Sequence, residues 1–181
     1  MAIKQVGIFC GSNEGKDPRF LEAALQLGAI LGDNHYAVVY GGGTRGLMGA
    51  VARTAKQHGS RIISVVPQRF AGHQILEETD ETLMVDTMQD RKKLMIDRSD
   101  AFIILPGGMG TLDEFSEVFT LQLLGLSGRP VALLNTAGFF KPLISLMETM
   151  VDSGFLKSSC WDLLIIKEHP QEILQALEKA T

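Results

Sequence analysis

The residues of this sequence best suited to chemistry form a run of glycines followed by carboxylates, from Pro106 to Glu114. Gly107, Gly108 and Gly110 have no Cβ, so the backbone N–H groups around them can turn toward an anion. A helix that starts near Thr111 adds its own unpaired N–H groups and the positive end of its dipole. The run therefore predicts a phosphate-binding loop with a carboxylate close to it.

Thr111 and Glu114 also have an interpretation that needs no ligand. The spacing Thr-x-x-Glu places a hydroxyl at the N-cap and a carboxylate at N3, which is the pattern of a capping box. Both interpretations can hold, but a capping box does not need the preceding glycines. At N3 the helix dipole favours the ionised form of Glu114 by roughly 0.3–1 kcal/mol, so we expect a carboxylate there and not a general acid.

A second glycine-rich segment, Gly41–Gly49, contains the spacing GxGxxG at Gly41, Gly43 and Gly46. A dinucleotide site also needs an acidic residue about 20 positions further on, where the sequence has none. An NTP-binding P-loop, GxxxxGK[ST], is absent from the sequence. Some of these glycines, Gly49 among them, are expected only to let a helix pack closely. This segment therefore predicts a tight loop rather than an NAD or NTP site.

Short apolar runs alternate with longer segments of helical period along the chain, which predicts an α/β, Rossmann-like parallel sheet with helices on both faces. Residues 1–181 are expected to form a single Rossmann-like nucleotide-binding domain. The predicted strands are Val6–Phe9, Ala37–Tyr40, Ile62–Val66, Leu83–Val85, Ala101–Leu105, Val131–Leu134 and Leu163–Ile166. The predicted helices are Pro18–Leu31, Leu47–His58, Met88–Arg98, Thr111–Leu124, Phe140–Asp152 and Pro170–Lys179.

Ligands of open parallel sheets bind at the carboxyl ends of the strands. Three small or glycine-rich loops follow predicted strands: Cys10–Asn13, Gly41–Gly49 and Pro106–Thr111. We expect them to converge on one edge of the sheet. The polar segment from Pro67 to Glu81 is predicted to be a long loop that folds over a site, and its part from Arg69 to Glu78 to influence the choice of base.

Composition and charge exclude several classes of partner. The net charge is -4 and the basic residues are scattered, which argues against a nucleic-acid-binding surface. No apolar run approaches the roughly 20 residues of a membrane span, and the first residues lead into a strand instead of a secretory leader, so we expect a cytoplasmic protein. Cys10 and Cys160 are expected to be buried thiols. The four histidines have no metal-ligand spacing, so neither a metal nor a cofactor is predicted.

Three sequence elements together resemble the LONELY GUY family of cytokinin riboside 5′-monophosphate phosphoribohydrolases, many of whose bacterial members carry an older lysine decarboxylase-like label. The signature PGGxGTxxE is complete from Pro106 to Glu114, and GGGxxGLMG is complete from Gly41 to Gly49. The helix start that contains Arg-Lys is present at Met88–Met95. The resemblance covers nearly the whole chain.

The resemblance implies a Rossmann-like homodimer that needs no cofactor. It releases the free base and ribose 5-phosphate from a purine nucleoside 5′-monophosphate, either a cytokinin type or one like AMP. The catalytic residues that it implies are Arg91 and Glu114, with Lys92 assisting and Glu81 near the nucleotide. The substrate-binding residues predicted from the loops and the resemblance together are Gly11, Ser12, Gly42, Gly43, Glu81, Arg91, Lys92, Gly107, Gly108, Met109, Gly110, Thr111 and Glu114.

Cleavage of an N-glycosidic bond builds positive charge on the ribose, so a fixed carboxylate such as Glu114 can hold ribose hydroxyls, stabilise the ring or orient water. The planar guanidinium of Arg91 can bind an oxyanion while fixing that carboxylate. The residues alone also allow Arg91, Lys92 and Lys93 to be the solvated face of a helix. The nearly all-apolar helix at Phe115–Leu126 is expected to lie partly in a two-fold interface next to Glu114.

Two other functions compete with the hydrolase. A nucleotide-sensing Rossmann module would need the phosphate loop but not the carboxylate at the sugar. A lysine decarboxylase would ordinarily hold pyridoxal phosphate on a Schiff-base lysine, and no lysine in the sequence has the features of that role.

Overall fold

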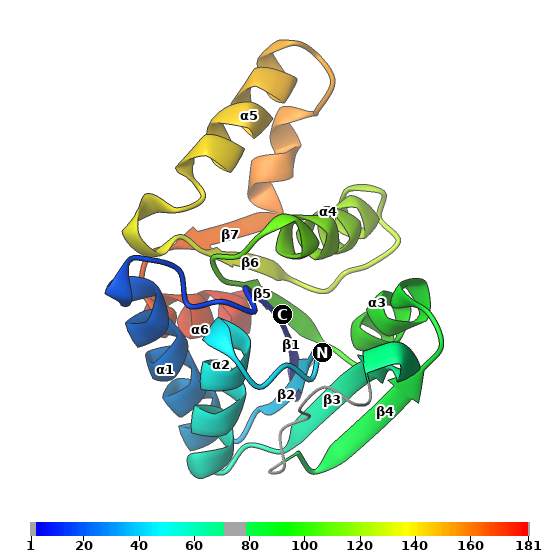
Figure 1. Ribbon diagram of the computed structural model, residues 1–181. Helices are drawn as coiled ribbons and strands as arrows, with labels where there is room; N and C mark the ends of the chain where they lie inside the picture. The colour runs from blue at the N-terminus through cyan, green and yellow to red at the C-terminus, as the bar shows by residue number, and fades with distance from the viewer. Residues whose placement is uncertain (1–2, 71–78, 181) are drawn as a thin grey trace.

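The computed structural model describes residues 3–70 and 79–180 (Figure 1). In this part of the chain seven strands form one parallel sheet in the order β4-β3-β2-β1-β5-β6-β7. The strands are β1 (Gln5–Phe9), β2 (Ala37–Tyr40), β3 (Ile62–Pro67), β4 (Glu81–Val85), β5 (Ala101–Ile104), β6 (Val131–Leu134) and β7 (Leu164–Lys167). The predicted α/β parallel sheet is confirmed.

The helices are α1 (Pro18–Asp33), α2 (Gly46–Gln57), α3 (Met88–Asp97), α4 (Met109–Leu123), α5 (Lys141–Asp152) and α6 (Pro170–Lys179). Short 3-10 turns occur at Gln68–Phe70, Thr136–Gly138 and Ser158–Asp162. Helices α1, α2 and α6 lie on one face of the sheet, and α3, α4 and α5 on the other (Figure 1). None of the helices in the described residues is long and apolar enough to cross a bilayer.

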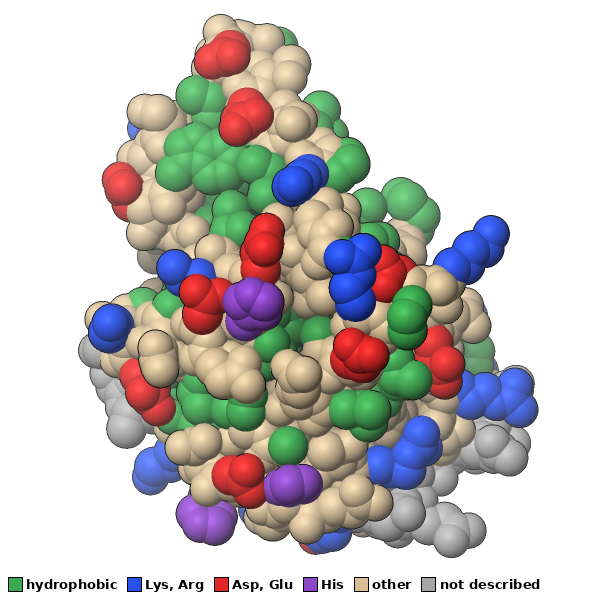
Figure 2. Space-filling model, turned by 90° about the vertical axis from the view of Figure 1, so that its left-hand side faces the viewer, with side chains coloured by type: hydrophobic (Ala, Val, Ile, Leu, Met, Phe, Trp, Pro, Cys, Tyr) green, Lys and Arg blue, Asp and Glu red, His purple; other side chains and the backbone are tan. Residues whose placement is uncertain are grey.

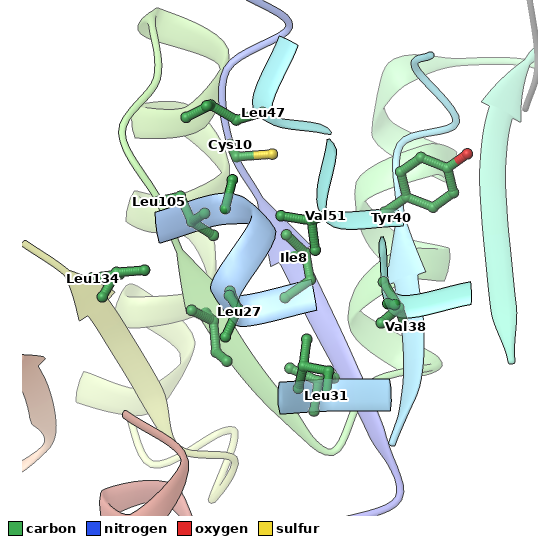
Figure 3. Packing of buried hydrophobic residues seen from close by; sticks show 14 of the residues in the cluster. Ile8, Cys10, Leu27, Leu31, Val38, Tyr40, Leu47, Val51, Leu105 and Leu134 are labelled. Carbon is green, nitrogen blue, oxygen red and sulfur yellow. The ribbon is translucent and has the colours of Figure 1, made fainter. Parts of the chain in front are cut away.

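Two apolar cores hold these layers together, one on each face of the sheet. Leu27 and Leu31 of α1 and Val51 of α2 pack over Ile8 and Val38 of the central strands on the first face (Figure 3). On the second face Met95, Phe115, Val118, Phe119 and Met147 from α3, α4 and α5 cover the other side chains of the same strands. The inner strands β1, β2, β3, β5 and β6 are buried on both sides, as continuous apolar runs in parallel strands require, whereas the edge strands β4 and β7 are only partly buried.

The position where the strand order reverses lies between β1 and β5. The chain leaves β1 toward β2 on one side, whereas β5 pairs with β1 on the other side. A crevice opens at the carboxyl ends of the strands at such a point, which is where open α/β sheets bind ligands.

Two boundaries differ from the predicted ones in ways that affect the site. Helix α4 begins at Met109 with Gly108 as its N-cap, so Thr111 is the third helical residue and the predicted capping box is wrong. The strand predicted at Leu83–Val85 begins already at Glu81, and β3 continues to Pro67, so the loop between them is shorter than predicted. Residues 71–78 of that loop lie outside the described part of the chain.

Candidate active site

A cavity of about 580 Å³ lies at the carboxyl ends of β1, β2 and β3, beside the first turns of α3 and α4. This volume is in the range of small-molecule sites. All three predicted loops contribute to it, so their convergence on one edge of the sheet is confirmed. Its lining residues are Cys10, Gly11, Ser12, Gly41, Gly42, Gly43, Met48, Val66, Pro67, Phe70, Met88, Arg91, Lys92, Gly108, Gly110, Thr111, Asp113 and Glu114.

The loops after β1 and β5 meet beside the cavity because a glycine allows the contact. The N–H of Gly11 donates a hydrogen bond to the carbonyl oxygen of Pro106 at 3.0 Å. A Cβ on Gly107 would lie 2.2 Å from Thr111 Oγ1 and 2.8 Å from the backbone N of Gly11. Only glycine therefore fits at position 107, where it closes the two loops on each other.

The amino end of α4 faces the cavity without a side-chain cap. Helices α1 and α3 have N-caps whose side chains accept backbone N–H groups, Asp17 and Thr87 respectively. The N-cap of α4 is Gly108, which has no side chain to do so. The first N–H groups of a helix have no partner within it, so those of α4 are donors available to an anion in the cavity.

Arg91 and Glu114 form a buried ion pair at the centre of the site. Arg91 Nη1 donates to Glu114 Oε1 at 2.6 Å, and both side chains are only 8% exposed. The guanidinium also passes directly over Gly41, where an added Cβ would lie 1.8 Å from Nη2. The alternative that Arg91 belongs to a solvated helix face is therefore wrong.

Burial raises the pKa of Glu114 above its ordinary value, and Arg91 opposes that rise through its charge and its hydrogen bond. Glu114 lies in the second turn of α4 and not at N3, so the predicted placement of this carboxylate at the helix start is wrong, and desolvation has the largest effect on its pKa. The neighbouring thiol of Cys10 has its pKa raised by burial and also by the charge of Glu114, so it is a neutral group in the cavity wall.

Lys92 reaches the cavity but is already engaged by two carboxylates. Its Nζ lies 3.0 Å from Asp113 Oδ2 and 2.7 Å from Glu117 Oε2. The ion pairs with Glu117 and Asp113 raise the pKa of Lys92. A Schiff-base lysine must lose its proton to act as a nucleophile, so this environment disfavours that role for Lys92.

Most of the predicted substrate-binding residues line the cavity, but three do not. Gly107 supports the loop from outside the lining, and the side chain of Met109 is 80% exposed. Glu81 is at the amino end of β4, on the edge of the sheet opposite to the cavity. Its carboxylate pairs with Arg61 at 2.6 Å and with Arg98 at 3.1 Å. The prediction that Glu81 lies near the nucleotide is therefore wrong, because Glu81 begins β4 whereas the cavity lies at the carboxyl ends of the strands.

Reasoning from the sequence alone missed much of the apolar wall of the cavity. Met48, Val66, Pro67, Phe70 and Met88 form it together. Met88 lies seven positions from Met95 on the same helix face, a spacing typical of core residues, but only Met95 is fully buried. The ends of strands and helices adjoin cavities rather than the core, and periodicity does not distinguish these positions.

The fold and the site define a class: a Rossmann-like α/β protein with a ligand-sized cavity where its strand order reverses. Solved structures agree on the fold. The molybdenum cofactor binding protein from the phototrophic bacterium Rippkaea orientalis has a TM-score of 0.75 at 22% identity, with 99% of this chain and 98% of that chain covered. The Moco carrier protein of Chlamydomonas rheinhardtii has a TM-score of 0.74 at 19% identity over the same shares. At these identities the likeness concerns the fold alone.

Sequence comparisons give the family. A family model described as possible lysine decarboxylase matches residues 48–177. The probable cytokinin riboside 5′-monophosphate phosphoribohydrolase LOGL2 of Oryza sativa subsp. japonica is 39% identical over 98% of this chain and 73% of its own length. The cytokinin riboside 5′-monophosphate phosphoribohydrolase LOG7 of Arabidopsis thaliana is 38% identical over 98% of this chain and 82% of its own length.

The chain therefore belongs to the LONELY GUY family, and the resemblance inferred from its motifs is confirmed. It is an enzyme that hydrolyses the N-glycosidic bond of a nucleotide. This finding favours the hydrolase over the non-catalytic sensor.

Proposed function

We propose that the enzyme hydrolyses the N-glycosidic bond of a purine riboside 5′-monophosphate, a cytokinin type or one like AMP, and releases the free base and ribose 5-phosphate. The observation that carries the proposal is the buried Arg91–Glu114 pair, which shares one cavity with the uncapped amino end of α4. The names of the relatives support the same substrate class.

The phosphate binds at the amino end of α4 in this proposal. Gly108 and Gly110 line the cavity, and an added Cβ at either would have no protein atom within 4 Å. Packing of the protein therefore does not demand glycine at these two positions, whereas the close approach of a bound oxyanion to the backbone N–H groups does.

The ribose lies next to Glu114. As the bond to the base breaks, positive charge develops on the ring, and a carboxylate fixed beside it stabilises that charge or orients the attacking water. Arg91 holds the carboxylate in place through the contact at 2.6 Å. The pair is preorganised before the substrate arrives, so little reorganisation is needed in the transition state.

The base lies against the apolar wall that Met48, Val66, Pro67, Phe70 and Met88 form. The flat faces of a purine ring match such a surface, while the phosphate and the sugar take the polar side of the cavity. Phe70 and Met88 are 36% and 38% exposed, so they stand at the rim, where a substituent on the base would extend.

The test is to incubate the enzyme with a panel of purine and pyrimidine 5′-monophosphates and the matching nucleosides, and to measure free base by chromatography. We expect purine monophosphates to react and their nucleosides to react far more slowly, because the phosphate positions the ribose. Glu114→Gln is the matched control: it keeps the size of the side chain but removes its charge, so kcat should fall about 10²-fold or more while the ligand still binds. Equal kcat/KM for adenosine and AMP, or a fully active Glu114→Gln, would contradict the proposal.

We also infer that a second copy of this chain covers part of the α4 and α5 surface. Phe115, Val118 and Phe119 of α4 belong to the core, but Leu124 and Leu126 just beyond the helix are 66% and 72% exposed. Helix α5 projects from the body, and hydrophobic side chains gather on that projecting part (Figure 2). Exposed apolar side chains that gather on one part of a surface, as on the projecting part with α5, are typical of an interface. Sedimentation that shows only monomer across a range of concentrations would contradict the dimer.

A further inference from the structure

Lys92, the residue after Arg91, makes a second ion-pair link between helices α3 and α4. Lys92 Nζ lies between Asp113 and Glu117, which are one helical turn apart on α4. Residues one turn apart share a face of a helix, so a single ammonium group can bind both. Arg91 and Lys92 of α3 thus bind three carboxylates of α4, and Glu114 is the middle one in sequence.

The geometry points to Lys92 as a positioning residue, which docks the first turn of α3 on α4 and so sets the contact between Arg91 and Glu114, without itself binding the substrate. This inference rests on the proposed function, since it assigns a role in the same reaction. It differs from the role that the sequence suggests for Lys92, which is to assist at the substrate.

The contacts of Lys92 argue against a direct role at the phosphate. An ammonium group has three donors, and carboxylate oxygens of Asp113 and Glu117 already lie within reach of Nζ, at 3.0 and 2.7 Å. The side chain is only 17% exposed. To bind a phosphate, the ammonium group of Lys92 would have to give up its contacts with two carboxylates. The N–H groups at the amino end of α4 have no partner within the helix, so they can bind a phosphate without breaking a contact.

Lys92 also influences the electrostatics of the buried carboxylate. The charged and titratable groups that act on Glu114 are Arg91 and Lys92 from α3 and Asp113 from α4, and the thiol of Cys10 at the end of β1 is coupled to it. The positive charge of Lys92 lowers the pKa of Glu114, and the negative charge of Asp113 raises it. Removal of the ammonium group therefore raises the pKa of Glu114 and takes the ion-pair partner away from Asp113 and Glu117.

The next residue along the chain provides the control. Lys93 is 74% exposed and pairs with Asp97 within α3, so it bridges no helices. Lys92→Met and Lys93→Met remove the same charge from adjacent positions of one helix. We expect Lys92→Met to lower kcat about tenfold or more, because small misplacements of reacting groups are costly, and to change KM by less than about threefold. The acidic limb of its pH profile should move to higher pH, and Lys93→Met should behave like the wild type.

Two further variants, Glu117→Gln on α4 and Lys92→Arg on α3, distinguish a positioning role of Lys92 from a general loss of folding. Glu117→Gln removes the shorter contact from α4 and should lower kcat in the same direction with a smaller loss. Lys92→Arg keeps a cation that reaches both carboxylates, and it should recover most of the turnover that Lys92→Met loses. Melting temperatures identify any variant that fails to fold, and the Glu117→Gln and Lys92→Arg results then decide the question.

The titration of Glu114 gives a readout that does not need turnover. Its side-chain carboxyl, followed by ¹³C NMR in the free enzyme, should titrate at higher pH in Lys92→Met than in the wild type and be unchanged in Lys93→Met. A large rise in KM with unchanged kcat, or an unchanged titration, would overturn the positioning role. If the wild type released no base from any monophosphate, the proposed function would fail instead, and the titration would still test the bridge.

Discussion

Gly110 offers the sharpest test of where the phosphate binds, because the structure predicts opposite effects on stability and on activity. It is the second residue of α4 and lines the cavity. Its φ angle is not in the left-handed region, and an added Cβ would have no protein atom within 4 Å. Nothing in the described structure therefore opposes an alanine at this position.

The expected gain in stability follows from backbone entropy. Gly is less favourable than Ala in a helix by roughly 0.5–1 kcal/mol, so Gly110→Ala should raise the free energy of unfolding by up to about that amount. For a chain of this size, 1 kcal/mol corresponds to a shift of about 2–4 °C in Tm, so the melting temperature should rise by about 1–4 °C.

The expected loss of activity follows from the space that the new methyl group takes. It would stand in the cavity beside the N–H groups of the first turn, where we place the phosphate. We expect kcat/KM for the monophosphate to fall about tenfold or more, on the scale of a misplaced or lost anion contact. The slow reaction of the nucleoside should change much less, so that the preference for the monophosphate shrinks.

Gly128→Ala is the matched control. Gly128 also has an ordinary φ angle and no atom within 4 Å of an added Cβ, but it lies in the loop after α4, away from the active-site cavity. The kcat/KM of the Gly128→Ala variant should equal that of the wild type. A Gly110→Ala variant that melts higher and keeps full activity would refute a phosphate at the amino end of α4, and one that melts lower would refute the packing argument.

Three further predictions concern other parts of the site. In Gly41→Ala the new Cβ would lie 1.8 Å from Arg91 Nη2. Steady-state kinetics should therefore show a loss of turnover that approaches the loss in Arg91→Ala. A fully active variant would mean that Arg91 can act from another position. The partly exposed ion pairs of Glu81 with Arg61 and Arg98 are structural, so Glu81→Gln should leave kcat and KM unchanged. Denaturant titration should show that the free energy of unfolding falls by about 1 kcal/mol or less. Burial raises the pKa of Glu114 above its ordinary value of 4.5, and the proposed role of this side chain requires its ionised form. The pH profile of kcat/KM should therefore decline on the acidic side through a value higher than 4.5, and a decline at or below 4.5 would contradict this.

The predictions from sequence succeeded where a short local pattern has a single physical cause. Alternating apolar runs and helical periods gave the parallel sheet with helices on both faces, since a strand buried on both sides must be apolar throughout. Because the carboxyl ends of parallel strands share an edge, the loops at Gly11, Gly42 and Gly108 had to meet. The buried pair of Arg91 and Glu114 was predicted only through the family resemblance.

The errors at the site come from effects that a local pattern does not contain. Thr-x-x-Glu from Thr111 to Glu114 has the spacing of a capping box, but α4 begins two residues earlier because Gly108 takes the N-cap. Glu81 is separated from the cavity by the length of β4, and Met88 lines the cavity at the start of α3 while Met95 is buried in the core. In each case the outcome depended on where an element begins or ends in the folded structure.

The sequence by itself determined the order of strands and helices, the family, and the glycines that leave backbone N–H groups open to an anion, because these follow from residue type and spacing along the chain. Only the tertiary structure decided that Arg91 lies over Gly41, that desolvation raises the pKa of Glu114, and that Lys92 bridges Asp113 and Glu117. Those features arise where α3, α4 and the loop after β2 meet in space. Burial and charge pairing depend on distances between segments far apart in the chain, which neither composition nor periodicity records.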